Sequence, residues 1–597
     1  MRRLFYIFVF LLIACPAWGA TKTVCASGCD YTTIAAASSG ATAGDTVNVS
    51  TGTYNENNPT FTKALTWVAI DGNGTVTITN SGTGAYAATF TGNNAAILIT
   101  GFIFDGLNVK ASAISLAANA QNKTCDHCIF QNATNLITFN GGGITNISNS
   151  SFLGSPEYVL YGNVGNLTAN NNTFNVTVGT AFGYITGGII TFIGSSSTVA
   201  FSTAAAFWDL NGSNITLNST GNIINVSGGG NKYINGTRSS SSGSVTISDT
   251  ITSSATYSSN VFYFNVAGWA IDFNHTNITI TNADYTGTLF AFINQINPKI
   301  RNSTITMTAP TSTNAFTPIA ISSLGTDGTN GGTVTGATLT NNTIYSINKT
   351  GYIISIGSET SNAGNNKLDN AILSHNKIYG YDYFYPEAGD ASTHGIFVGH
   401  NTAYVMFNDI YGGPYGIVLK GSGAVWASGG AFYNKVIGSK NHASLLFKGV
   451  KNVPAFNNTL EALNSVYLIA INENNSGQEA TGITLKNNVV VSSNPNVLLI
   501  DADALTGFSS DNNLFYRVGG DAINFTVGGV DKTFSQWQAL GYDANGLNSD
   551  PLFISATNFH LQSSSPARGT GVNVGLVHLD SPDIGAEPYL QYVPWRH

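Results

Sequence analysis

Two lysines close similar apolar phrases, and their type and position suit acid–base chemistry on an anionic ligand. Lys420 ends the run in "GIVLKG" and Lys448 ends the run in "SLLFKG", while Gly399 takes the aligned place in "GIFVGH". If the alternate apolar residues of each phrase point inward, both lysines point outward at one position of neighbouring strands. Two stacked ammonium groups without a counterion are unfavourable, and desolvation lowers a lysine's pKa. The pair therefore suits a polyanionic ligand.

Uronic-acid polysaccharides are polyanions whose cleavage by β-elimination uses these residue types. The reaction needs a cation that neutralises the sugar carboxylate and a base that takes the proton alpha to it. We assign Lys420 and Lys448 to these two roles in open order, with His400 or His394 assisting the leaving oxygen. The preceding loop, residues 380–394, supplies aromatic and acidic side chains for sugar binding. The substrate-binding candidates are Tyr381, Tyr383, Tyr385, Asp390 and, further on, Lys440.

The same lysines also fit an ordinary surface, because lysines at strand ends are often solvated or bond to loop carbonyls. Two features that a lyase would favour are missing: no arginine lies between Arg301 and Arg517, and no acidic cluster suits calcium. A hydrolase needs closely placed carboxylates, whereas Asp382, Asp390 and Asp409 are scattered over loop and strand. We therefore expect no cofactor, with calcium as an unsupported alternative.

The elements that position these residues are short strands. No segment keeps a helical period, and runs of β-branched residues alternate with Gly, Asn and Ser. Asparagine phrases recur at spacings of 26, 24, 30 and 25 residues, with apolar phrases between them. Several strands per repeat of this length, with no room for helices, predict a solenoid of parallel β-coils whose asparagines bond along the axis. The recurring residues are Asn342, Asn376, Asn408, Asn434, Asn458, Asn488 and Asn513.

Both ends of the chain carry phrases typical of one group of exported proteins. The opening "VCASGCDYTTIAAASSGATAGDTVNVSTGTYNE", the following "AIDGNGTVTIT", and the closing "FSQWQALGYDANGLNSDPLF" and "PDIGAEPY" resemble the pectate-lyase-like superfamily. The resemblance implies an all-β, right-handed parallel β-helix with a short N-terminal cap helix and a C-terminal capping segment. It does not imply one activity, because this superfamily contains lyases, hydrolases, epimerases, phage tailspikes and non-catalytic surface proteins.

One continuous solenoid accounts for the length of 597 residues, since each coil packs only on its neighbours. Charge, Tyr and His concentrate in one part of it, and Trp537, Pro551 and Phe553 indicate a cap over the last coil, whose strand edges would otherwise be exposed. The expected organisation is a signal peptide at 1–20, an N-terminal cap and first coils at 21–79, the β-helix at 80–515 with the candidate site at 380–451, and a capping segment at 516–597.

Composition and the N-terminal segment limit the partners and the compartment. With 43% hydrophobic residues the chain can bury a large core although only 9% are charged, and its net charge of -8 without a basic run excludes nucleic acid. Arg2 and Arg3 precede an apolar stretch typical of a secretory signal, and no later segment is long enough to span a membrane. We expect a secreted or periplasmic protein, with lipid anchoring at Cys15 as the alternative.

The other four cysteines form two close pairs, Cys25 with Cys29 and Cys125 with Cys128. Export favours disulfides within each pair. A metal or redox site using His127 in "TCDHC" is disfavoured because zinc normally needs four ligands and no second such pair exists.

Two functions remain open. The lysines, histidines and tyrosines predict a secreted protein that binds, and by lyase-like β-elimination cleaves, acidic polysaccharide. The missing arginine and metal ligands favour a non-catalytic surface or adhesive rod that binds glycans. Either interpretation makes polysaccharide the partner, and the oligomeric state stays open.

Overall fold

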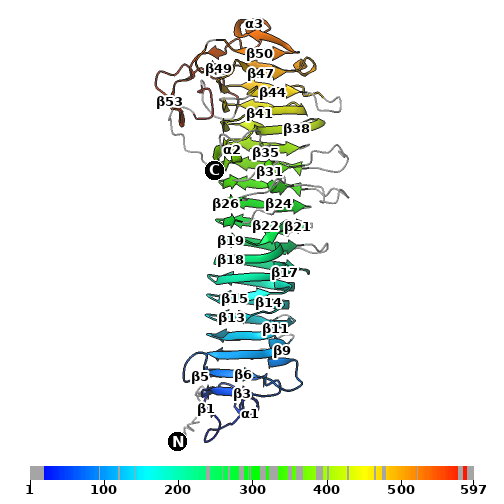
Figure 1. The fold of residues 1–597 in the computed structure, drawn as a ribbon, viewed down its shortest axis with the longest axis vertical. Helices are drawn as coiled ribbons and strands as arrows, with labels where there is room; N and C mark the ends of the chain where they lie inside the picture. The colour runs from blue at the N-terminus through cyan, green and yellow to red at the C-terminus, as the bar shows by residue number, and fades with distance from the viewer. Residues whose placement is uncertain are drawn as a thin grey trace, which may run out of the picture. The chain divides into compact units, whose positions relative to one another are not determined.

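The computed structural model of this chain consists almost entirely of β-strands (Figure 1). Its backbone divides into two compact units, Met1–Thr173 (unit 1) and Phe174–His597 (unit 2). The structure describes residues 19–92, 95–117, 122–141, 143–236, 243–257, 260–265, 269–281, 288–293, 295, 297–308, 317–321, 334–346, 352–357, 368–384, 394–399, 402–425, 429–440, 442–462, 466–472, 479–520, 522–575 and 582–587.

Unit 1 begins with the expected cap helix and continues as parallel coils. Helix α1 (Ile34–Gly40) starts after Thr33, whose hydroxyl accepts a bond from the Ala36 N–H at 3.1 Å. Strands one coil apart then pair in parallel, each with the next. In order they are β1 (Thr21–Val24), β2 (Thr46–Val49), β5 (Thr66–Ala69), β8 (Ile97–Thr100), β10 (Lys123–Asp126) and β12 (Ile144–Ser148).

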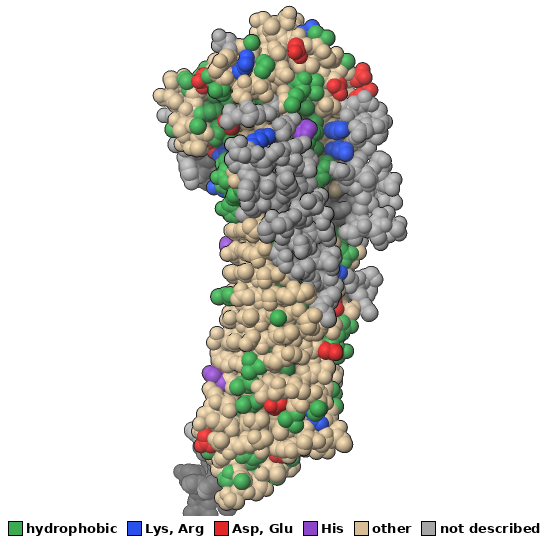
Figure 2. Space-filling view, viewed as in Figure 1, with side chains coloured by type: hydrophobic (Ala, Val, Ile, Leu, Met, Phe, Trp, Pro, Cys, Tyr) green, Lys and Arg blue, Asp and Glu red, His purple; other side chains and the backbone are tan. Residues whose placement is uncertain are grey.

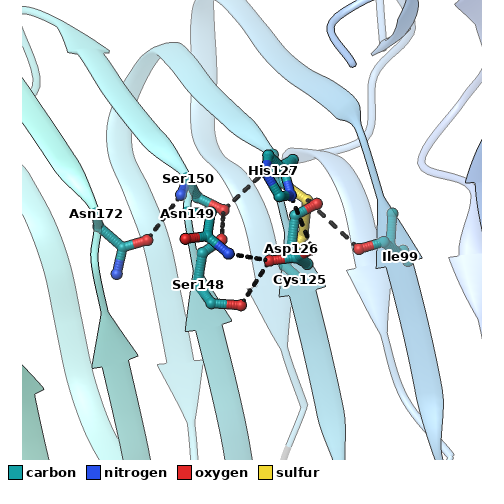
Figure 3. The surroundings of a disulfide bond; sticks show 9 residues. Ile99, Cys125, Asp126, His127, Ser148, Asn149, Ser150 and Asn172 are labelled. Carbon is teal, nitrogen blue, oxygen red and sulfur yellow. Dashed lines mark hydrogen bonds and ion pairs between the residues drawn. A yellow bond between two sulfur atoms is a disulfide. The ribbon is translucent and has the colours of Figure 1, made fainter. Parts of the chain in front are cut away.

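Both cysteine pairs of unit 1 are disulfides, as expected: Cys25 with Cys29 and Cys125 with Cys128. Figure 3 shows the second one at a corner of the coil, where Asp126 accepts bonds from Ser148 Oγ at 2.7 Å and Asn149 Nδ2 at 2.8 Å. His127 Nδ1 lies 2.8 Å from the same carboxylate. Because both sulfur atoms are joined and buried, the "TCDHC" phrase holds a corner together rather than a metal.

From β33 to β50, unit 2 repeats three strands per coil, and each strand pairs in parallel with its equivalent in the next coil. We call the three resulting sheets columns A, B and C. In the region of interest, column A contains β33 (Ala371–Ser374), β36 (Ala403–Met406), β39 (Gly430–Phe432), β42 (Pro454–Phe456), β45 (Thr484–Lys486) and β48 (Ser509–Asp511).

Columns B and C continue each coil. Column B contains β34 (Lys377–Tyr379), β37 (Asp409–Tyr411), β40 (Lys435–Ile437), β43 (Thr459–Ala462), β46 (Val489–Ser492) and β49 (Leu514–Arg517). Column C contains β35 (His394–Gly399), β38 (Tyr415–Val425), β41 (Leu445–Lys451), β44 (Ile469–Asn472), β47 (Asn496–Ile500) and β50 (Asn524–Val527). This arrangement is a parallel β-helix, so the predicted fold class is confirmed, while its right-handedness stays a prediction.

The core of unit 2 is a stack of apolar side chains from alternate strand positions. In column B every central residue points inward, because its two neighbours point outward. These inward residues are at most 1% exposed: Ile378, Ile410, Val436, Leu460, Val490 and Phe515.

The repeated asparagines form one internal hydrogen-bond ladder, as their spacing predicts. Asn408 Nδ2 donates to Asn434 Oδ1 and to the Leu373 carbonyl, both at 2.9 Å. The ladder ends at Asp543, whose Oδ1 accepts from Asn513 Nδ2 at 2.8 Å. A carboxylate fits the last place because it has no donor that needs a further partner. The members are Asn342, Asn376, Asn408, Asn434, Asn458, Asn488, Asn513 and Asp543.

The last coil is covered by β51 (Val530–Thr533) and α3 (Phe534–Ala539). Trp537 is fully buried, its ring stacks on Phe525 at 4.7 Å, and its Nε1 donates to Asp543 at 2.9 Å. The capping expected around Trp537 is therefore present.

The remainder of the C-terminal segment lies elsewhere, on the flank of the coils. The hairpin of β53 (Phe553–Ser555) and β54 (Asn558–Leu561) lies beside them (Figure 1). Leu561 and Ile584 pack on Val489 of column B, and Phe553 joins the same cluster instead of covering the last coil with Trp537.

Candidate functional site

The two lysines singled out from the sequence lie next to each other on column C. Lys420 and Lys448 are direct partners in the register of β38 and β41, and Gly399 precedes them on β35. Leu419 and Phe447 beside them are fully buried, whereas both lysines are half-buried. Neighbouring strands are about 4.8 Å apart, so the ammonium groups share one patch of the outer surface. Ion pairs between described residues include neither lysine.

The structure describes the side chain of neither histidine assigned to this pair. His394 is the first residue of β35 and lies opposite Tyr415, five positions before Gly399. At about 3.3 Å per residue, the backbone of His394 is roughly 16 Å along the strand from Gly399. His400 lies outside the described residues, as do Tyr385 and Asp390. The side chain of Tyr381, on α2 (Tyr381–Phe384), is also outside them.

Two other predicted residues, Tyr383 and Lys440, meet in one pocket of about 450 Å³ on the outer face of column B. They come from different corners: Tyr383 from α2 after β34, and Lys440 from the turn after β40. The pocket spans three successive coils and reaches the tip of the C-terminal hairpin. Its lining residues are Tyr379, Tyr383, Tyr411, Gly412, Ile437, Gly438, Lys440, Ala556, Thr557 and Phe559.

A ladder of tyrosines forms one wall of this pocket. Tyr345 of β30 (Thr343–Ser346), Tyr379 and Tyr411 occupy the same outward position on successive strands, and their rings stack at centroid distances of 5.0 Å. Tyr383 lies across this ladder, 5.0 Å from Tyr379 with its ring tilted by 58°. Its side chain is 52% exposed, so it offers an accessible ring. Burial raises the pKa of Tyr379 and Tyr411, so both hydroxyls remain donors at neutral pH.

The floor of the pocket is formed where the chain leaves column B. Gly412 follows Tyr411, Gly438 follows Ile437, and both glycines have φ of 74°. This left-handed conformation is cheap for glycine and turns the chain sharply without a side chain. The small floor leaves room between the tyrosine wall and the hairpin residues Ala556 and Thr557.

A buried lysine joins the C-terminal segment to this region. Lys435 is 6% exposed, and its Nζ lies 2.6 Å from Glu587 Oε1 and 3.2 Å from Asp409 Oδ1. Burial acts to lower the pKa of Lys435, but Glu587 and Asp409 outweigh it and the pKa is raised. The same ammonium group lies 5.8 Å from the Tyr411 ring and 6.0 Å from the Phe559 ring. Lys435 thus links column B to the C-terminal segment through a buried ion-pair cluster beside the pocket, which we call the Lys435 tie.

Sequence reasoning gave no role to this tie or to Phe559. Lys435 and Asp409 each follow a ladder asparagine, so their stacking is readable from the repeat. Glu587 lies 152 residues from Lys435, in a segment without any repeat, so no pattern joins them. A ring pair at the next corner was also missed: Tyr415 stacks on His442 at 4.5 Å, between the pocket and the lysine pair along the chain.

Charge is concentrated where these residues lie. Lys and Arg side chains gather over the later coils of unit 2, while the earlier coils show mostly uncharged surface (Figure 2). Among the described residues no group of three or more His, Cys, Asp or Glu could hold a metal ion.

No helix in the described part of the chain is long and apolar enough to cross a membrane.

This arrangement can bind a polar ring that carries negative charge. Binding pockets of this size combine apolar and aromatic walls with a few placed polar groups. Here Tyr383 offers a ring face, the hydroxyls of the half-buried Tyr379 and Tyr411 offer hydrogen bonds, and Lys440 offers a positive charge.

Comparison with known proteins adds little to this geometry. No protein-family model and no curated protein sequence matches the chain. Among solved structures, a mannuronic acid specific polysaccharide family 6 lyase from human gut microbiota is 12% identical, with 87% of this chain and 89% of that chain covered and a TM-score of 0.18. Tailspike protein 3 of bacteriophage CBA120 is 9% identical, with 84% and 56% covered and a TM-score of 0.17.

Likenesses at these TM-scores carry no argument about either fold or site. The assignment as a parallel β-helix rests on the strand pairing of this chain itself. Membership of the pectate-lyase-like superfamily stays a prediction from the sequence.

Proposed function

We propose that this chain binds an acidic polysaccharide on the outer face of its later coils. One observation carries the proposal: the pocket that joins the exposed ring of Tyr383 to Lys440. Sugar rings stack on aromatic faces through their C–H groups, and their carboxylates pair with ammonium groups. The signal sequence expected at residues 1–20 and the two disulfides support an exported protein that meets such polymers outside the cell.

Binding is tested by titration calorimetry of the mature protein with acidic polysaccharides, including homogalacturonan and polymannuronate, and with neutral glucans. We expect an acidic polymer to bind, with about tenfold weaker affinity in Tyr383→Ala and in Lys440→Ala, a loss that corresponds to about 1.4 kcal/mol. Lys532→Ala removes a lysine of β51, away from the pocket, and should bind like the wild type. Equal binding by all four proteins would place the ligand elsewhere, and no binding to any acidic polymer would refute the proposal.

Cleavage by β-elimination is a second candidate, favoured by the in-register pairing of Lys420 with Lys448 on neighbouring strands. In this reaction one lysine neutralises the uronate carboxylate, and the nitrogen of the other takes the proton from the carbon alpha to it. The electron pair of that C–H bond forms a double bond and the bond to the glycosidic oxygen breaks. The oxygen leaves with a proton from water, so atoms and charges balance.

The absorbance of unsaturated uronates distinguishes cleavage from binding alone. The wild type and the Lys420→Ala, Lys448→Ala double variant are incubated with the same acidic polymers. A rise in absorbance that the double variant loses would establish elimination at this pair. A flat trace with intact binding in both proteins would identify a non-catalytic glycan-binding surface protein.

A further inference from the structure

The outer face of column B is a polar track in the earlier coils of unit 2. These coils contribute the second half of β19 (Gly243–Ser253), then β23 (Asn277–Ile280) and β26 (Thr304–Met307), which pair in parallel. Short hydroxyl and amide side chains therefore stand in two straight rows, exposed or half-exposed. The first row holds Thr250, Asn277 and Thr304, and the second holds Thr252, Thr279 and Thr306.

The second row leads without a register shift to the pocket. Thr306 is the partner of Tyr345, which is followed by Tyr379 and then by Tyr411. Each step is about 4.8 Å, so hydrogen-bonding side chains line the track and tyrosines line its final part. A chain of sugar rings could thus lie along the coils before it reaches Tyr383.

Beyond the pocket the first row of outward positions is no longer accessible. Thr459, Val489 and Leu514 point outward like Thr250, yet each is at most 1% exposed. The C-terminal segment covers them: the Ala586 N–H donates to Thr459 Oγ1 at 2.9 Å, and Ile584 packs in the cluster that contains Val489. Beyond the pocket the first row is therefore covered, while in the second row Val491 is buried and Glu461 and Tyr516 are half-buried.

The cover is anchored at the boundary itself. Glu587 meets the buried Lys435 on β40, whose last residue, Ile437, lines the pocket. The hairpin residues Ala556, Thr557 and Phe559 stand over the same coil as the far wall. A polymer that follows the track meets this wall at the pocket.

We infer that the pocket receives the end of an acidic glycan chain, while the track holds the sugars that precede it. This inference rests on the proposed function and adds the mode of recognition. The pocket volume of about 450 Å³ is that of a small-molecule site, which fits a chain end better than a continuous polymer.

Counting binding sites against chain length tests this mode. One acidic polymer that binds the wild type is partly depolymerised, and equal masses of long and short chains are titrated. Recognition of ends predicts that the number of protein molecules bound per gram rises in proportion to the number of chain ends. A number that stays constant or falls as chains shorten would mean internal binding and would overturn the inference, while the proposed function would stand.

Two variants locate the effect. Thr557→Trp fills the pocket from the hairpin, so it should abolish the binding that scales with ends. Thr252→Trp places the same bulk on the distant track. It should therefore weaken the binding of long glycan chains and leave the binding of the shortest ones unchanged. If Thr557→Trp binds short chains like the wild type, the pocket is not the place of the chain end. Absence of binding at every length would instead remove the proposed function and the inference with it.

Discussion

Lys435 Nζ and Glu587 Oε1 lie 2.6 Å apart although 152 residues separate them along the chain. The contact joins a strand of column B to the segment that walls the pocket, and Asp409 from the previous coil completes the charge cluster. One buried ammonium group therefore joins two coils of unit 2 to the segment that walls the candidate site.

Replacing this lysine is expected to destabilise unit 2 strongly. Lys435→Met keeps the aliphatic chain but leaves Glu587 and Asp409 unpaired, which costs about 3 kcal/mol when a buried pair is broken. The free energy of unfolding is measured in urea. Arg301→Met is the matched control, because Arg301 pairs with Asp272 but is 40% exposed, and exposed pairs contribute below about 1 kcal/mol. Similar losses in both variants would contradict a special role for Lys435.

Replacing one asparagine of the ladder, either by alanine or by a charged residue, should destabilise unit 2. Asn434→Ala leaves the buried N–H and Nδ2 donors of Asn408 without their acceptor, at about 1–3 kcal/mol for each unsatisfied group. Asn434→Asp keeps the acceptor but faces Asn458 Oδ1 and the Val405 carbonyl without a donor, so it should be worse at neutral pH. The thermal unfolding midpoints of both variants are compared with that of Asn277→Ala. Asn277 is exposed on its strand, so we expect little change in its midpoint.

Removing the cap over the last coil should lower the stability of unit 2 and promote aggregation. Trp537→Ala empties a fully buried site and should cost about 3–5 kcal/mol, and the uncovered strand edge should promote association. Trp537→Phe retains a stacked ring but loses the bond to Asp543, so its cost should be smaller. Light scattering during heating measures both effects, and monomeric behaviour of Trp537→Ala would argue against capping.

Lys123 in unit 1 should make stability depend on alkaline pH. Burial lowers its pKa from 10.5 to about 8, while its Nζ donates to the carbonyls of Gly92 at 3.0 Å and Ala95 at 2.6 Å. Because the folded protein holds this proton less tightly than the unfolded chain, unit 1 should gain stability as pH rises from about 8 to 10.5.

This gain should disappear in Lys123→Met, which cannot titrate. Urea midpoints of both proteins are compared across that pH range, following the fluorescence of Trp67, a buried residue of unit 1. Parallel curves for the two proteins would show that another group causes the dependence.

The repeat in the sequence was sufficient to predict the coils and the lysine pair. Every ladder asparagine marks the same corner, so the spacing sets which residues of successive strands are partners, and Lys420 met Lys448 as expected. Loops of different length between the strands do not disturb this register, because each asparagine bonds to its equivalent one coil away.

The amino-acid sequence by itself thus determined the parallel β-helix, its ladder, its disulfide pairs and the outward lysines, since all of these follow from contacts one coil or one turn apart. Only the tertiary structure decided that the C-terminal segment returns to column B, that Phe559 and Thr557 line one pocket with Tyr383, and that Lys435 pairs with Glu587. Such contacts join segments with no common period, and burial of apolar surface selects them without a pattern that can be read along the chain.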